Sequence, residues 1–82
     1  MIKEIVNATV LRTYTQEYKV KNNITKKQRC IIIDTKECGM VFIRSAAKWA
    51  NTISVGDRVN LIGTLSNNQS GMTFLNNVKL KY

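Results

Sequence analysis

The sequence predicts an all-β fold, a five-stranded Greek-key barrel with one short helix between its third and fourth strands. Short runs rich in Val, Ile, Thr, Tyr and Phe recur along the chain, which is typical of strands. A single helix-like stretch, residues 45–51, interrupts these runs after the third one. Proline is absent, so the turns must come from Gly, Asn and Asp.

Residues 3–14 form the expected first strand, in which Val6, Ala8 and Val10 alternate with residues of the opposite face. Residues 15–27 are polar and basic, and we expect a loop there with its turn at Asn22-Asn23. Short strand extensions, such as residues 18–20, flank that turn. Residues 28–35 form the expected second strand, whose apolar run is too continuous to assign its faces.

The third strand is expected at residues 40–45, after a tight connection at residues 36–39. Its residues alternate between two faces, with Val41 and Ile43 on one and Met40, Phe42 and Arg44 on the other. Val41 and Ile43 are a natural core pair. The pattern leaves open whether Phe42 faces the core or the solvent.

In the helix-like stretch, Ser45 can cap the first turn and two alanines favour the helix. We expect Trp49 and Ile53 to plug one end of the barrel. The fourth strand, residues 57–66, follows the turn pair Gly56-Asp57. Gly63 within this strand predicts a sharp bend or a bulge, where a small sheet curls onto itself.

A polar loop at residues 66–71 leads into the fifth strand, residues 72–81. Phe74, Val78 and Leu80 are in phase along this strand, which predicts a core position for Phe74.

The run from Val55 to Leu65 resembles the fourth strand of an OB-fold, whose pattern is Gly-Asp-x-Val-x-Val-x-Gly-x-Leu. The hairpin from Asp34 to Gly39 resembles the connection between strands two and three in many OB-folds. The nearest alternative is an SH3-like barrel, but its helical turn precedes the last strand, whereas two strands follow the helix here. The resemblance implies a single OB-fold domain over residues 1–82, similar in kind to small single-stranded DNA-binding proteins of replication, recombination and phage-like elements.

The charge balance points to a polyanionic partner. The chain carries 13 Lys and Arg against 5 Asp and Glu, a net charge of +8. Self-repulsion of this size costs stability, so a nucleic-acid partner would explain its retention, although a solvated basic surface is the simpler alternative. We expect a cytoplasmic protein without a membrane partner, because no apolar stretch approaches the length of a membrane span and the N-terminus lacks a secretory hydrophobic region.

No catalytic constellation or metal site is visible, so we expect a non-enzyme without a cofactor. The chain has no His, and its five acids are not paired by any convincing spacing. Cys30 and Cys38 alone cannot supply the four ligands of a structural zinc site. Cys30 lies in an apolar run and is expected in the core, and Cys38 lies near a turn.

The candidate nucleic-acid contacts gather around the expected loop between strands one and two, which borders the binding groove of an OB-fold. Long basic side chains there can follow a phosphate backbone, and exposed aromatic rings can stack on bases. The candidates are Tyr18, Lys19, Lys21, Lys26, Lys27 and Arg29, with Phe42 and Arg44 on strand three and Asn68 in the loop between strands four and five. Tyr14 is a weaker stacking candidate. For each cation the alternative is a solvated surface residue.

The favoured function is sequence-independent binding of single-stranded DNA in replication or recombination. A second hypothesis is a small accessory subunit that binds and stabilises a polymerase, primase or helicase. RNA binding is a third, because the sequence does not separate DNA from RNA. A homo-oligomer is also open, since an exposed first or fifth strand can pair with a second copy.

Overall fold

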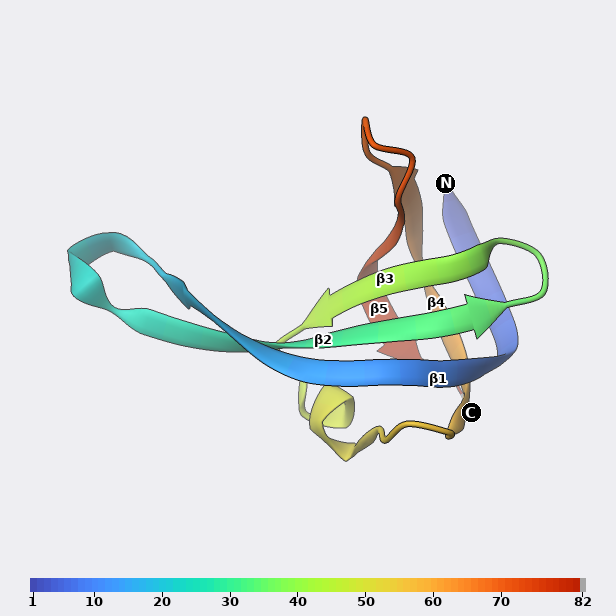
Figure 1. The fold of residues 1–82 in the computed structure, drawn as a ribbon, viewed down its shortest axis with the longest axis horizontal. Helices are drawn as coiled ribbons and strands as arrows, with labels where there is room; N and C mark the ends of the chain where they lie inside the picture. The colour runs from blue at the N-terminus through green and yellow to red at the C-terminus, as the bar shows by residue number, and fades with distance from the viewer. Residues whose placement is uncertain (82) are drawn as a thin grey trace.

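The computed structural model describes residues 1–81 as five strands and two short 3₁₀ helices. The elements are β1 (Ile2–Lys19), η1 (Lys21–Asn23), β2 (Thr25–Thr35), β3 (Gly39–Ser45), η2 (Lys48–Thr52), β4 (Arg58–Asn67) and β5 (Thr73–Leu80). The strands close into a barrel in the order β1-β2-β3-β5-β4, and only β3 and β5 are parallel (Figure 1). The predicted all-β, five-stranded OB-fold barrel is therefore confirmed.

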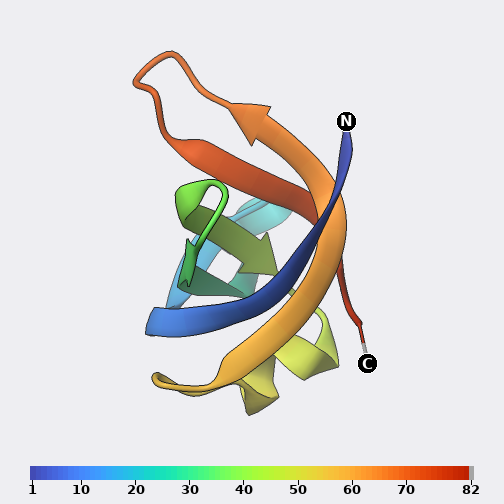
Figure 2. The same cartoon turned by 90° about the vertical axis from the view of Figure 1, so that its right-hand side faces the viewer.

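The barrel closes because β1 is shared between two neighbours. Its first half pairs with β4 and its second half pairs with β2, so that Thr9 lies opposite both Arg58 and Asp34. Figure 2 shows β1 and the strongly curved β4 running side by side around the barrel. Neither short helix in the described part of the chain has the length or the apolar character of a membrane-spanning segment.

A bulge near the start of β1 changes which residues face inward. Asn7 has a φ of 57°, and the pairing with β4 shifts between Ile5 and Ala8. Asparagine tolerates this left-handed conformation better than other residues with a side chain. Ile5, Ala8 and Val10 are consequently buried, whereas Val6 is 66% exposed. The alternation that grouped Val6 with the two core residues is wrong, because the bulge inserts one extra residue between them.

The core is built from the inward residues of all five strands. Val41 and Ile43 are fully buried in it, as predicted. The other members are Ile5, Ala8, Val10, Ile31, Ile33, Ala50, Ile53, Val59, Leu61 and Leu75. Because every strand contributes, the outward residues between them are held at fixed spacings on the barrel wall.

Gly63 marks a close approach of β4 to β5. A Cβ atom at this position would lie 2.7 Å from the Asn76 carbonyl oxygen and 2.9 Å from the Leu75 Cγ atom. The pairing of β4 with β5 shifts between Ile62 and Thr64, which confirms the irregularity predicted at Gly63, and the extra residue of this shift lies on β5, between Asn76 and Lys79. Only a residue without a side chain fits this contact.

The bulge on β5 corrects the prediction for Phe74. Asn77 has a φ of 52° and reverses the phase of the strand, so that Leu75 is buried, and Val78 and Leu80 pack against the core. Phe74 precedes the bulge and lies on the outer side of the barrel wall, half-buried. The in-phase pattern with Val78 and Leu80 fails because it ignores the extra residue.

The connection between β3 and β4 closes one end of the barrel. Its helix, η2, is a 3₁₀ helix that begins at Lys48, later than the expected cap at Ser45, which ends β3. Ile53 is buried and Trp49 packs partly buried against the core, as expected for plugging residues. The Gly56-Asp57 turn is also present, with the Asp57 carboxylate accepting a 2.9 Å hydrogen bond from the Ser54 amide.

Residues 15–29 form a two-stranded ribbon, which we call the arm. The expected loop is instead a continuation of β1 and β2, paired from Thr15 with Arg29 to Lys19 with Thr25. The turn lies where predicted, with Asn22 and Asn23 at φ values of 64° and 62°. Figure 1 shows the arm projecting away from the barrel, and none of its residues is buried.

Candidate nucleic-acid interface

The outward residues of four adjacent strands form one continuous surface, which we call the groove face. Strand register arranges them in rows that run across the sheet. The first row is Arg12, Ile32, Phe42 and Phe74, and the second is Tyr14, Cys30 and Arg44. The groove face thus combines apolar rings with cations in neighbouring rows.

Three contacts join the rings and the cations of these two rows. The Phe42 and Phe74 ring centroids lie 5.8 Å apart, with the ring planes tilted by 42°. The Arg44 guanidinium carbon lies 5.6 Å from the Phe74 centroid, and the Arg12 carbon lies 5.2 Å from the Tyr14 centroid. Each of these arginines therefore places a positive charge beside an aromatic ring, an arrangement that suits a phosphate next to a stacked base.

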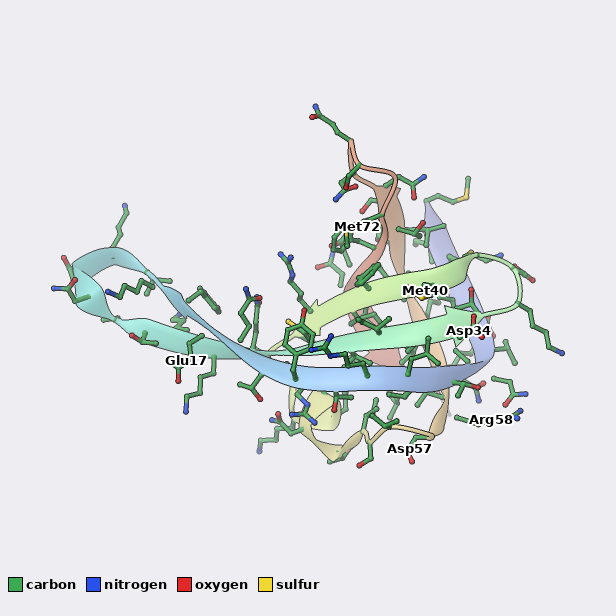
Figure 3. All side chains as sticks on the ribbon, viewed as in Figure 1. Glu17, Asp34, Met40, Asp57, Arg58 and Met72 are labelled. Carbon is green, nitrogen blue, oxygen red and sulfur yellow. The ribbon has the colours of Figure 1, made fainter. Side chains whose placement is uncertain are left out.

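A shallow hollow of about 80 Å³ lies between the rings. Phe42, Phe74, Tyr14 and Arg44 line it, together with Met72 at the base of the β4–β5 loop (Figure 3). The hollow is too small to enclose a nucleobase, so a ligand would lie on this surface rather than inside it.

Cys30 lies beneath this surface and not in the barrel core. Its side chain is only 4% exposed, so its predicted burial is confirmed. Its register places it in the row of Tyr14 and Arg44, and its Sγ atom lies 3.6 Å from the Gln16 Oε1 atom. Cys30 and Cys38 are both free thiols.

The arm extends the groove face beyond the barrel. Gln16 lies opposite Gln28, with a 3.3 Å hydrogen bond between their side chains, and Tyr18 lies opposite Lys26. Alternation along the strands puts both pairs on the same face as Tyr14 and Cys30. The four rows from Phe74 to Lys26 contain three cations, Arg12, Arg44 and Lys26, and no acid.

The opposite face of the arm holds the other basic candidates of the ribbon. Arg29 is half-buried there and donates hydrogen bonds to the hydroxyls of Thr13, at 2.8 Å, and Thr15, at 3.3 Å. Lys27 lies 3.7 Å from the Glu17 carboxylate across the ribbon, and Lys19 shares this face. The predicted basic cluster is thus divided between two faces.

Two further candidates lie at loops. Lys21 begins the 3₁₀ turn at the tip of the arm. Asn68 stabilises the β4–β5 loop, because its Oδ1 atom accepts hydrogen bonds from the backbone amides of Ser70 and Met72, at 3.0 and 2.9 Å, and from the Ser70 hydroxyl. This oxygen is therefore occupied within the loop, which leaves the amide nitrogen of Asn68 for a ligand.

Sequence reasoning missed Arg12 and Phe74 as members of the groove face, and it ranked Tyr14 as only a weaker candidate. Arg12 is separated from Tyr14 by one residue, so strand alternation would have placed both on one face. Phe74 was assigned to the core because the bulge at Asn77 was not recognised. An asparagine inside an apolar strand pattern was the available signal.

The acids do not converge on a site. Figure 3 shows Glu17 out on the arm, far from Asp34 at the other end of the β2–β3 sheet, and Asp57 on the η2–β4 turn. Within residues 1–81 no three side chains of His, Cys, Asp or Glu are grouped as a metal site.

A larger cleft, of about 380 Å³, lies between the start of β1 and the β2–β3 turn. Lys3 and Glu37 form an ion pair among its lining residues. Their mutual hydrogen bond, and then their charges, raise the pKa of Lys3 and lower the pKa of Glu37. Both groups are exposed to solvent, which screens the pair. Its opposite charges give the cleft no preference for an anion.

Comparison of the chain with protein-family models, with curated protein sequences and with solved structures finds no significant match.

Proposed function

We propose that this protein is a non-enzymatic binder of single-stranded DNA that acts in replication or recombination without sequence preference. The observation that carries the proposal is the ring pair Phe42 and Phe74 with Arg44 over the Phe74 ring, within four rows of the groove face that hold no acid. Aromatic stacking contributes about 1–3 kcal/mol per base and is available to every base, so it tolerates any sequence.

The geometry favours single strands over duplex DNA. The rings lie on the outer wall of the barrel beside a hollow of about 80 Å³, so they can stack only on bases that are already unpaired. Phosphate contacts from Arg12, Arg44 and Lys26 would make binding weaken as salt rises. The net charge of +8 adds long-range attraction for the polyanion.

An accessory-subunit role depends on other surfaces of the barrel. Ile2 and Val6 on β1 are 74% and 66% exposed, and they lie outside the groove-face rows. Phe42 and Phe74, by contrast, are half-buried and lie beside Arg12 and Arg44, which supports nucleic acid rather than protein as the ligand of the groove face. A replication protein bound through Ile2 and Val6 would leave that face free.

The deciding experiment is fluorescence anisotropy of a labelled oligothymidine at two salt concentrations, with duplex DNA as competitor. We expect salt-sensitive binding that duplex does not displace. Oligouridine of the same length separates RNA from DNA, because only RNA offers a 2′-hydroxyl. An absence of binding at low salt would reject the proposal and favour the accessory-subunit role.

Two arginine variants test the site itself. Arg44→Ala should weaken oligothymidine binding and reduce the salt slope by about one, because one phosphate contact is lost. Arg58→Ala removes the same charge at the start of β4 (Figure 3), outside the four named rows, and should change affinity only slightly. If both variants bind with the same affinity, the groove face is not the site. Phe74→Leu keeps an apolar side chain and removes the ring, and it should weaken binding at every salt concentration.

A further inference from the structure

The arm has an unpaired strand edge on β1. The pairing of β1 with β4 ends at Thr9, and the backbone of Val10 is bonded to Gly56 and Asp57. Residues 13–19 pair only with β2, and within residues 1–81 no other backbone hydrogen bond reaches them. From Tyr14 to Lys19 every residue is exposed. A two-stranded ribbon without a packed face is marginally stable, and a free edge is a template for another strand.

We propose that this edge pairs with the same edge of a second copy, which joins two arms into a four-stranded antiparallel sheet around a two-fold axis. The inference is independent of nucleic-acid binding. Because the axis is perpendicular to the sheet, the groove faces of both copies lie on the same side of it. Pairing uses strand edges and leaves both faces of the arm open.

Charge selects the β1 edge over the β2 edge. Residues 13–19 carry one acid, Glu17, and one cation, Lys19. The pairing of β3 with β2 ends at Arg29, so the edge of β2 is free over residues 25–28. This edge carries Lys26 and Lys27 and no acid. Lysines on an edge oppose pairing with an identical edge. In the proposed sheet, the two β2 strands lie outermost and their lysines stay far apart.

The register follows from the extent of the exposed edge. A two-fold centred on Gln16, the middle of residues 13–19, pairs this whole segment. Tyr14 then lies opposite Tyr18 of the second copy, twice in the dimer, and Thr15 lies opposite Glu17. Aromatic pairs directly across an antiparallel sheet stabilise it, and no like charges are directly opposed. The same register carries the arm tip, with Lys21, toward the turn that holds Asp57.

The first test is molar mass by light scattering across protein concentration, with the full chain. The proposal expects a mass that rises from 9.3 kDa toward twice that value. A mass that stays at one chain up to hundreds of micromolar would overturn it.

Cysteine cross-linking then tests the edge and the register. An equimolar mixture of Thr15→Cys and Glu17→Cys should form a disulfide-linked dimer on mild oxidation, because these positions are directly opposed. Both lie on the face away from the native thiol of Cys30. Thr25→Cys, exposed on the β2 edge, is the matched control and should stay at the background of the unmodified protein. Two results would reject the β1-edge dimer. One is cross-linking of Thr25→Cys above the background of the unmodified protein. The other is a protein that dimerises by mass but whose Thr15→Cys and Glu17→Cys mixture yields no more cross-linked product than the Thr25→Cys control.

Discussion

The barrel and the arm are built from the same two strands, yet different forces hold them. In the barrel half of β1, Ile5, Ala8 and Val10 are buried. At Thr9 the strand is paired with β4 on one edge and with β2 on the other. In the arm half, no residue is buried and one edge is unpaired. Burial therefore fixes the barrel, whereas the arm depends on the hydrogen bonds and side-chain pairs of a single hairpin.

This difference explains where the proposed binding residues lie in the molecule. Barrel strands hold Phe42, Phe74 and Arg44 at set spacings, because their neighbours Val41, Ile43 and Leu75 are locked in the core. The arm carries mostly polar and charged side chains, and these gain little from folding alone. A bound polyanion or a second copy would give the arm the contacts that the isolated chain lacks.

The largest expected effect is obtained by breaking the barrel at Gly63. Gly63→Val would force a branched side chain against the Asn76 carbonyl and the Leu75 side chain, where even a Cβ atom is too close. We expect a loss of about 3 kcal/mol or more in the free energy of unfolding. In a domain of this size that corresponds to a melting temperature lower by roughly 10–20 °C in a calorimetric scan.

The matched control is Thr64→Val, on the same strand. Thr64 is half-buried on the outer side and already carries a branched side chain of the shape of valine, so the free energy of unfolding should change by less than about 1 kcal/mol. If Gly63→Val had the same melting temperature as the Thr64→Val control, the β4–β5 contact would not limit the packing of the barrel.

The comparison also shows what a sequence can predict. The order of elements, the core pair Val41 and Ile43 and the irregularity at Gly63 were all predictable, because burial imposes strand periodicity and the close contact requires glycine. The bulges at Asn7 and Asn77 were not, since one left-handed residue reverses the phase without interrupting the apolar pattern. The two unrecognised bulges are the reason that strand alternation placed Val6 and Phe74 on the core face.

The arm was harder to predict for the opposite reason. Neither of its faces is buried, so its sequence shows no alternation of apolar and polar residues. Polar, lysine-rich segments are typical of loops, and only the extension around residues 18–20 indicated a strand. The division of the basic cluster between two faces needed the register, which places Lys26 opposite Tyr18 and Lys27 opposite Glu17.

A smaller effect should separate the two faces of the arm. Lys26→Ala removes a cation of the groove face, so the affinity for oligothymidine should fall and the salt slope should decrease by about one. Lys27→Ala removes a neighbouring cation that faces the other way and lies near Glu17, so its affinity should change less than twofold. Titration of both variants by anisotropy makes the comparison. Equal losses would mean that the ligand contacts both faces of the arm, contrary to a path along the groove face.

The smallest expected effect concerns the ion pair at the cleft, which neither the core nor the arm requires. Because Lys3 lowers the pKa of Glu37, the pair stabilises the fold above the unfolded-state pKa of this carboxyl, and that contribution is lost as pH falls through the lower folded value. The raised pKa of Lys3 acts at the other end of the scale, where its contribution is lost as pH rises through the folded value. Glu37→Gln should therefore lower the melting temperature slightly at pH 7, and the difference should disappear once the pH has fallen below the lowered pKa of Glu37, where this carboxyl is protonated in the unmodified chain. Equal melting curves at pH 7 would show that solvent screens the pair completely, as it does for many exposed ion pairs.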